Sequence, residues 1–268
     1  MNINDTLVVV RGAGDIATGT LHCLQSCGFK VVALETTKPT AIRRYVAFCE
    51  AVYDGQMTID NMTARCVSSI EEIEACFKAH ELPVVVDQKA ELIKVLKPHV
   101  VVDAILAKKN LGTTIDMAPL VIGLGPGFTA KKDVDIVIET MRGHRLGKII
   151  TEGSAQPNTG IPGVIAGFGK ERVIHAPAAG ILTSVAKISD VVSKGQTIAY
   201  IGETQVAATL DGVLRGLIRD GFDVPKGMKI ADIDPRITEQ KNCFSISDKA
   251  RTIAGGVLQA ILMYGDKS

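Results

Sequence analysis

The chain has 268 residues, enough for two modest domains of about 150 residues each. Hydrophobic residues make up 46% of it and charged residues 22%, a balance that excludes a mostly disordered protein. Thirty Lys and Arg stand against 29 Asp and Glu, so the net charge of +1 provides no field to attract nucleic acid or an anionic membrane. No Trp occurs and aromatic residues make up only 4%, which argues against a platform for stacking bases.

No segment of the sequence has the pattern of a targeting signal or a membrane helix. Residues 1–5 are not basic, and they lead into only four apolar residues, so no signal peptide is expected. No apolar run approaches the roughly 18 residues that a membrane helix needs. We therefore expect a soluble, cytoplasmic protein.

The six cysteines form no CxxC pair, the close spacing on which zinc ribbons and redox dithiols depend. A chain of this length needs no disulfide to stabilise its fold. The cysteines are Cys23, Cys27, Cys49, Cys66, Cys76 and Cys243. We expect six reduced thiols that pack as small hydrophobic side chains, and no metal site.

The first half alternates short apolar runs with amphipathic stretches, the pattern of strands that alternate with helices. Residues 7–10 predict a strand buried on both faces, and residues 30–34 predict the next one, after a helix that ends at Gly28. Pro39 predicts the start of a second helix. Further strands are expected at 57–59, 63–67, 84–87, 100–103, 120–122 and 135–139. This order favours a Rossmann-like, mostly parallel sheet with helices on both faces.

The turn after the first predicted strand has the pattern of a dinucleotide-binding loop, which lies at the carboxyl end of its strand. Gly12 permits a tight turn, Gly14 lets the backbone approach a phosphate, and Ala17 suits close contact between helix and strand. Glu35 ends the second strand 23 residues after Gly12, close to the roughly 20-residue spacing of an acid that binds ribose hydroxyls. The alternative is a tight turn in a sheet that binds nothing. The predicted phosphate-binding turn consists of Gly12, Ala13, Gly14, Asp15, Ile16 and Ala17.

Basic residues and glycines in the other loops are further candidates for contacts with an anionic ligand. Arg43 and Arg44 lie just inside the predicted second helix, where they either hold an additional phosphate or are solvated. Of the five histidines, only His144 lies in such a loop, which makes it the candidate for proton transfer, with a surface hydrogen-bonding role as the alternative. The remaining candidates are Lys108, Lys109, Gly125, Gly127 and Arg142.

The second half contains an internal repeat. Residues 176–182 and 192–201 recur as 208–214 and 224–233, at a constant offset of 32 residues with nine identities. Short strands between glycine turns predict two halves of a small β-sandwich that pack together. The pattern resembles the biotinyl/lipoyl barrel-sandwich hybrid, but no lysine occurs between Lys194 and Lys226, so neither lipoate nor biotin is expected. Asp232 and Asp234 either bind a metal or, as we favour, are solvated or form a salt bridge with Arg236.

These patterns predict four segments and one fold class. Residues 1–151 form a Rossmann-like domain that binds a nucleotide or cofactor, and residues 152–172, dense in turn formers, form a crossover loop. Residues 173–236 form a pseudo-twofold β-sandwich, and residues 237–268 form a helical segment that packs back on the first domain. The expected class is therefore α/β, with a Rossmann-like sheet, a barrel-sandwich-hybrid-like β-module and a terminal helix.

Six motifs together resemble the YqeB family of the selenium-dependent molybdenum hydroxylase system, over nearly the whole chain. They are RGAGDIA at 11–17, PTAIRRYVAF at 39–48, AKKNLGT at 107–113, IGLGPGF at 122–128, PNTG at 157–160 and ISDKA at 246–250. The resemblance implies an accessory role in the maturation of these hydroxylases. The first domain is also distantly similar to the Rossmann part of XdhC-type molybdenum-cofactor insertion chaperones. The resemblance supplies no catalytic residues.

Three functions are open at this point. The favoured one is a maturation factor that binds a pyrophosphate-containing ligand, either a molybdopterin dinucleotide or another nucleotide, between the glycine turn and the β-module. Its expected partners are a molybdenum hydroxylase or its maturation factors, with no nucleic acid and no membrane. The second is an NAD(P)-dependent oxidoreductase, for which only His144 offers a proton donor. The third is a non-catalytic docking scaffold. Catalysis, the identity of the ligand and assembly into a homo-oligomer stay open.

Overall fold

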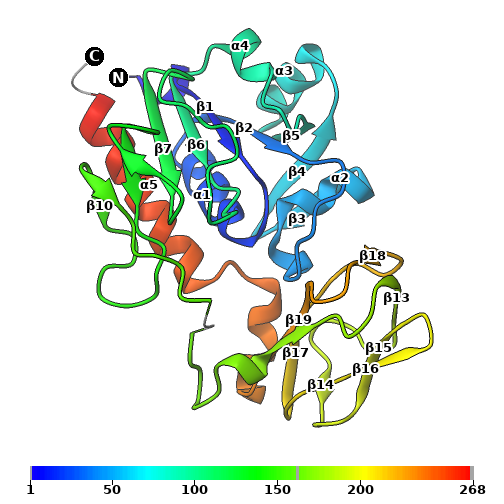
Figure 1. Cartoon of the computed structure of the whole chain (residues 1–268). Helices are drawn as coiled ribbons and strands as arrows, with labels where there is room; N and C mark the ends of the chain where they lie inside the picture. The colour runs from blue at the N-terminus through cyan, green and yellow to red at the C-terminus, as the bar shows by residue number, and fades with distance from the viewer. Residues whose placement is uncertain (1, 161–162, 266–268) are drawn as a thin grey trace. The chain divides into compact units, whose positions relative to one another are not determined.

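The structure is a computed structural model that describes residues 2–160 and 163–265 (Figure 1). The chain divides into two compact units. Unit 1 comprises the chain up to Pro39, Ala47–Asn158 and the chain from Ile246 onward, and unit 2 comprises Thr40–Val46 and Thr159–Ser245. Residues 161–162 of the predicted crossover loop and 266–268 of the predicted terminal segment lie outside the described residues. Within the described residues, no helix has the length and apolar character needed to span a membrane.

Nine strands of the described residues in unit 1 form one mixed sheet, in the order β10-β9-β7-β6-β1-β2-β5-β4-β3 (Figure 1). The pairs at its two edges, β3 with β4 and β9 with β10, are antiparallel, and the pairs between them are parallel. Their bounds are β1 Leu7–Arg11, β2 Lys30–Glu35, β3 Gln56–Ile59, β4 Met62–Val67, β5 Leu82–Val86, β6 Val100–Asp103, β7 Leu120–Leu124, β9 Ile136–Ile138 and β10 Ile149–Ile150. A separate small sheet pairs β8 (Thr129–Ala130) with β11 (Gly153–Ser154).

The central strands are apolar except for charged residues at their ends, because helices cover both of their faces. Successive side chains of a strand point to opposite faces, and Val9 on one face packs in a cluster with Ile73 of α3 and Ile93 of α4. On the other face, a Cβ atom on Gly256 of α5 would lie 3.1 Å from Ile138. The helices of unit 1 are α1 Asp15–Ser26, α2 Ala51–Asp54, α3 Ile70–Ala79, α4 Leu92–Leu96 and α5 Asp248–Gly265, with short 3₁₀ turns η1 Ile3–Asp5 and η3 Phe48–Glu50.

Helices α1 and α5 touch through their backbones, and Gly19 makes this contact possible. A Cβ atom on Gly19 would lie 2.7 Å from the carbonyl oxygen of Ala250, closer than real Cβ atoms approach. Gly256 is equally restricted, because its Cβ atom would lie 2.3 Å from the carbonyl oxygen of Gly147, whereas Gly255 has open space around it. The close approach of α1 and α5 therefore requires glycine at 19, and the approach of α5 to the segment after β9 requires glycine at 256, whereas neither contact requires it at 255.

We expect Gly19→Ala to lower the free energy of unfolding by about 1–3 kcal/mol, because the added methyl group forces the two helices apart. The matched control is Gly255→Ala, which adds the same methyl group in open space and should raise stability by up to about 1 kcal/mol through helix propensity. Urea unfolding followed by circular dichroism measures both. A stabilising Gly19→Ala would show that the helices do not pack at this point.

Unit 2 contains two antiparallel four-stranded sheets in its described residues, in the orders β12-β19-β17-β14 and β16-β15-β13-β18. The 32-residue repeat is visible in them, because β13 starts at Gly180 and β17 at Gly212. Each repeat gives a two-residue strand to the sheet of the other, since β14 pairs with β17 and β18 pairs with β13. The bounds are β12 Val173–His175, β13 Gly180–Ser184, β14 Val191–Val192, β15 Thr197–Ile201, β16 Thr204–Ala207, β17 Gly212–Leu217, β18 Asp223–Val224 and β19 Lys229–Asp234, with 3₁₀ turns η2 Arg44–Val46, η4 Lys170–Arg172 and η5 Ile237–Phe244.

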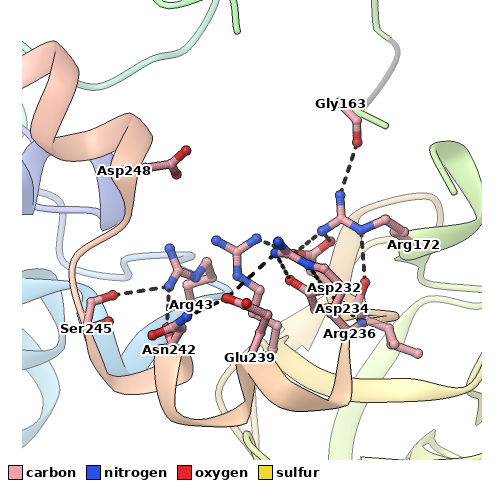
Figure 2. A network of polar contacts seen from close by, with 12 residues as sticks. Arg43, Gly163, Arg172, Asp232, Asp234, Arg236, Glu239, Asn242, Ser245 and Asp248 are labelled. Atoms are coloured by element: carbon pink, nitrogen blue, oxygen red, sulfur yellow. Dashed lines mark hydrogen bonds and ion pairs between the residues drawn. The ribbon is translucent and has the colours of Figure 1, made fainter. Parts of the chain in front are cut away.

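Paired charges lie along β19 in unit 2 (Figure 2). Buried Arg172 donates from one nitrogen to both carboxylate oxygens of Asp232, at 3.2 and 3.3 Å. Arg236 binds Asp234 through two nitrogens, at 3.0 and 2.8 Å. The salt bridge between Asp234 and Arg236 that the sequence favours is therefore confirmed.

The predicted fold class is wrong. The sheet of unit 1 is mixed, with antiparallel strands at both edges, and the described chain between β6 and β9 contains no helix. Unit 2 is a pair of separate antiparallel sheets. The structure is a mixed α/β protein with a large mixed sheet, and not the predicted combination of a Rossmann-like domain with a barrel-sandwich hybrid. Glycine turns and apolar runs predict local units, but they do not determine how the outer strands pair.

Two smaller expectations also fail. The helix predicted to start at Pro39 is replaced by two 3₁₀ turns and the four-residue helix α2, because this stretch is divided at Ala47 between the cores of unit 2 and unit 1. The cysteines do not all pack in a core, since Cys27 is exposed and Cys23 is half-buried. Burial raises the pKa of the Cys23 thiol to about 11, and Cys27 adds to the shift. Cys23 is therefore a protonated thiol at neutral pH.

Candidate functional site

The glycine turn connects β1 to α1 at the carboxyl edge of the large sheet of unit 1. Gly12 has φ +99°, a left-handed conformation that favours glycine, and its Cβ atom would lie 3.1 Å from the carbonyl oxygen of Ala104 after β6. The Gly12 amide donates to the carbonyl of Leu34 in β2 at 2.7 Å. The turn is thus held between the ends of β2 and β6, so that α1 starts directly above β1.

Gly14 leaves the start of α1 open. It is the N-cap residue of α1, no side chain caps the helix there, and a Cβ atom at residue 14 would meet nothing within 4 Å. By contrast, α3 has a full capping box, in which Ser69 and Glu72 satisfy each other's backbone amides. Helix N-termini carry amides without intrahelical partners and a positive dipole end, which together attract anions. An anion at α1 would therefore lie in the space beside Gly14.

Glu35 reaches back to the glycine turn from the end of β2. One carboxylate oxygen accepts a hydrogen bond from the Ala13 amide and the other accepts one from the Thr36 amide, both at 2.8 Å. Burial raises the pKa of Glu35, while these two hydrogen bonds oppose the increase. The structure thus brings Glu35 to the turn, as its spacing predicts, and the two backbone amides already use part of its capacity to accept hydrogen bonds.

A buried ion pair fixes the loop that carries Lys108 and Lys109. Arg11 at the end of β1 and Asp103 at the end of β6 are 3.6 Å apart and almost completely buried. Arg11 donates to the Thr113 hydroxyl, which in turn donates to Asp103 at 2.5 Å. Burial raises the pKa of Asp103, and the hydrogen bonds from Thr113 and Ile105 oppose that shift. The loop after β6 is thereby tied to the centre of the sheet.

The loop after β7 lies against the loop after β6. A Cβ atom on Gly127 would lie 2.7 Å from the Cα atom of Lys109, so these two candidates are brought together. Gly125 is similarly close to Thr140, whose hydroxyl would lie 2.4 Å from a Cβ atom at residue 125. Lys108 and Lys109 are exposed at this edge. Both glycines therefore serve close contact between loops.

The segment after β9 adds one buried carboxylate and one exposed arginine. Glu139 is 2% exposed, and its two oxygens accept hydrogen bonds from the amides of Met141 and Gln156 at 2.8 and 2.9 Å. Arg142 binds both carboxylate oxygens of Asp248 at the start of α5, at 2.6 and 3.1 Å. His144 is exposed in the turn that follows, and its role in proton transfer stays a prediction.

Arg43 and Arg44 belong to unit 2, whereas the glycine turn belongs to unit 1. Arg43 is buried and donates to the carbonyl oxygens of Asn242 and Ser245 at 3.2 and 3.4 Å (Figure 2). Arg44 donates to the carbonyl of Leu217 at 2.8 Å. Both guanidinium groups thus bind backbone carbonyls within their own unit, and whether either also contacts a phosphate stays a prediction.

Lys249 is a candidate that reasoning from the sequence missed. It lies in the first turn of α5 and is half-buried. The groups that influence its charge are Arg142, Asp15, Glu139 and Asp248, which come from the start of α1, the end of β9 and α5 itself. Burial lowers the pKa of Lys249, and Arg142 lowers it further. The ISDKA motif contains this residue, but sequence spacing cannot show that a segment about 100 residues after β9 returns to its end.

Comparisons with known proteins give one close relative and no family model. The chain is 55% identical over 257 residues to the uncharacterized protein YqeB of Escherichia coli (strain K12), a match that covers 96% of this chain and 47% of that protein. The chain thus spans about half the length of this relative. No protein-family model matches the sequence. The identity supports the YqeB family that the six motifs indicate.

Solved structures resemble the chain only weakly. The product-bound ectoine utilization protein EutE (DoeB) from Ruegeria pomeroyi is 11% identical, with a TM-score of 0.27 over 85% of both chains. A succinylglutamate desuccinylase/aspartoacylase from Rhodobacter sphaeroides is 13% identical, with a TM-score of 0.28 over 85% of this chain and 84% of that one. Likenesses this weak carry no conclusion about fold or function.

Proposed function

We propose, on the support for the YqeB family, that this chain is an accessory protein in the maturation of selenium-dependent molybdenum hydroxylases. In this proposal unit 1 binds a pyrophosphate-containing ligand, a molybdopterin dinucleotide or another nucleotide, as its cargo. The observation that carries the ligand class is the start of α1, which no side chain caps and which Gly14 leaves open. Each charge-assisted hydrogen bond from such an amide to a phosphate oxygen contributes about 1.5–3 kcal/mol.

The residues of the carboxyl edge fit such a ligand. The backbone at the start of α1 would hold the diphosphate, because the space beside Gly14 is open and faces the positive end of the helix dipole. Glu35 lies at the same turn, where its remaining lone pairs suit ribose hydroxyls. Lys108 and Lys109 are exposed on a loop at this edge of the sheet and would add positive charge.

We expect Gly14→Val to weaken binding of cytidine diphosphate and NAD⁺ at least tenfold in titration calorimetry. Residue 14 has φ −69° and open space, so valine fits the fold but fills the position of the phosphate. The matched control is Gly255→Val, which also places valine at an open site of unit 1. Unchanged affinity in a folded Gly14→Val protein would contradict the proposed site.

The identity of the ligand separates the proposed function from its alternative. Glu35 at the end of β2 suits the ribose of NAD(P) as well as that of a cytidine nucleotide. Native mass spectrometry of the purified full chain shows which ligand accompanies it. A cytidine or molybdopterin mass supports the accessory role, and an NAD(P) mass supports an oxidoreductase.

A further inference from the structure

A cavity of about 630 Å³ opens beside α4, at the edge of the large sheet where β6 and β7 begin. Its lining includes Pro98 and His99, which directly precede β6, and Pro119, which directly precedes β7. The glycine turn follows β1 at the opposite edge, where these parallel strands end. Strands of four and five residues, at about 3.3 Å per residue, separate the two places. The cavity is therefore distinct from the site at the glycine turn.

The cavity lies where the sheet lacks a covering helix. Residues 104–119 connect β6 to β7, and this connection, which the structure describes throughout, contains no helix. Met117 of the connection packs on the same core cluster as Ile93 of α4 and Val121 of β7. The connection and α4 therefore cover the same face of the sheet. A connection without a helix covers less of that face than a helix does, which accounts for the hollow beside α4.

The lining of the cavity combines apolar walls with two ammonium groups. Ala90, Ile93 and Met117 supply apolar surface. Lys94 in the last turn of α4 and Lys97 at its C-cap also line the cavity, and both are exposed. Among the residues that the structure describes, no hydrogen bond or ion pair engages either ammonium group. Both charges are therefore available to a ligand.

His99 supplies a third hydrogen-bond donor in a fixed position. Its amide donates to the Leu7 carbonyl at the start of β1 at 3.0 Å, and its Nδ1 accepts from the Leu7 amide at 3.1 Å. Because Nδ1 accepts, the neutral ring carries its proton on Nε2, which is a donor. The lining also contains Asp116, whose carboxylate already accepts a hydrogen bond from the Thr114 hydroxyl. The groups that remain for a ligand are thus mainly donors, which favours an anion.

We propose that this cavity binds a small amphipathic anion, an organic acid whose carboxylate binds at Lys94, Lys97 and His99. The apolar body of the acid would lie against Ile93 and Met117. The volume is within the range of about 300–1,000 Å³ of sites for small organic molecules, in which apolar walls bury the ligand and a few polar groups orient it. Hydrogen bonds from ammonium groups to a carboxylate are stronger than bonds between neutral groups. This site goes beyond the proposed function, because it takes a different ligand at the opposite edge of the sheet.

Octanoate tests this proposal, because it combines a carboxylate with a flexible apolar chain. It is titrated into the isotope-labelled full chain, and the chemical shifts of the backbone amides are followed by NMR. We expect saturable changes that cluster in residues 90–99 and 114–120. Acetate lacks the apolar chain and octylammonium reverses the charge, so each should bind at least tenfold more weakly. Changes that cluster elsewhere, or octylammonium that binds as tightly as octanoate, would overturn the proposal.

The double variant Lys94→Gln/Lys97→Gln removes both charges from exposed positions and should weaken octanoate binding at least fivefold. The matched control is Lys78→Gln/Lys131→Gln, which should bind octanoate within twofold of the parent. Lys78 is exposed in the last turn of α3, as Lys94 is in that of α4. Lys131 is exposed with a positive φ, as Lys97 is. Equal affinities of the two double variants would contradict a role of the cavity lysines.

Gly14→Val separates this inference from the proposed function. It fills the space at the start of α1, at the other edge of the sheet, so it should weaken binding of cytidine diphosphate and leave the affinity for octanoate unchanged. Loss of octanoate binding in a folded Gly14→Val protein would contradict a separate site. Failure of octanoate to bind a parent chain that does bind cytidine diphosphate would overturn the cavity proposal alone.

Discussion

We expect Arg11→Met to lower the free energy of unfolding of unit 1 by about 3–5 kcal/mol. Arg11 and Asp103 are 4% and 2% exposed, and their charges are 3.6 Å apart at the ends of the two central strands β1 and β6. Methionine fills much of the volume of the arginine, but it leaves the Asp103 carboxylate buried without a countercharge. Urea unfolding read by hydrogen exchange in the peptides of β1 and β6 measures the loss in unit 1 itself.

The control for this prediction is the double variant Arg11→Met/Asp103→Leu. Removing both charges removes the uncompensated carboxylate, so the double variant should be more stable than the single one. Thr113 loses its acceptor in Asp103 in the double variant, which leaves part of the loss in place. A double variant no more stable than Arg11→Met would show that lost packing, and not the unpaired charge, causes the effect.

The loss caused by Arg11→Met should shrink as the pH falls. Burial raises the pKa of Asp103, and Arg11 opposes this by stabilising the carboxylate, so its removal raises that pKa further. A group whose pKa is higher in the folded than in the unfolded state favours folding at low pH and loses that effect as the pH rises through the folded value. The difference between variant and parent should therefore be smaller at pH 5 than at pH 7.

Local features of the fold were predictable because they depend on neighbouring residues. The apolar run at 7–10 and the glycines of the turn gave β1 and the start of α1, and the 32-residue offset is repeated in the starts of β13 and β17. The hairpin of β3 and β4 at one edge was predictable from its short connection. The sheets of unit 2 were not, because their pairing joins distant segments, such as β12 with β19. The two-residue strand β10, which pairs with β9 across a ten-residue connection, is too short to show a periodic pattern in the sequence.

The candidate site was predictable to the same extent. Gly12 and Gly14 follow β1, and Glu35 ends the neighbouring strand β2. The order of the strands therefore already indicates that these residues lie close together. The paired arginines that include Arg43 suggest phosphate binding from the sequence. In the structure, Arg43 binds the carbonyls of Asn242 and Ser245, about 200 residues later in the sequence. No sequence pattern marks Lys249 as a functional residue, because most of the charged groups that influence it belong to other elements and come near it only through tertiary packing. Partners so far apart in sequence leave no periodic signal.

In unit 2, we expect Arg172→Met to lower stability by about 3–5 kcal/mol, because it leaves the buried Asp232 with only the more distant Arg215, 3.7 Å away. Arg172 also donates to the carbonyls of Ile233 and Gly163, which would lose a charged partner (Figure 2). Hydrogen exchange in the peptides of β17 and β19 under increasing urea measures the loss.

The matched control for Arg172→Met is Arg65→Met in unit 1, followed in the peptides of β4 and β5. Arg65 binds both carboxylate oxygens of Glu81 at 2.6 and 2.8 Å, a shorter pair than that of Arg172, but the Arg65 side chain is 45% exposed against 5% for Arg172. Water solvates the partners of an exposed ion pair after the pair is broken, so Arg65→Met should lower stability much less than Arg172→Met. Losses of equal size would show that hydrogen-bond geometry, rather than burial, sets the contribution of each pair. A larger loss for Arg172→Met means that burial sets the cost, through the Asp232 carboxylate and the backbone carbonyls that lose their charged partner.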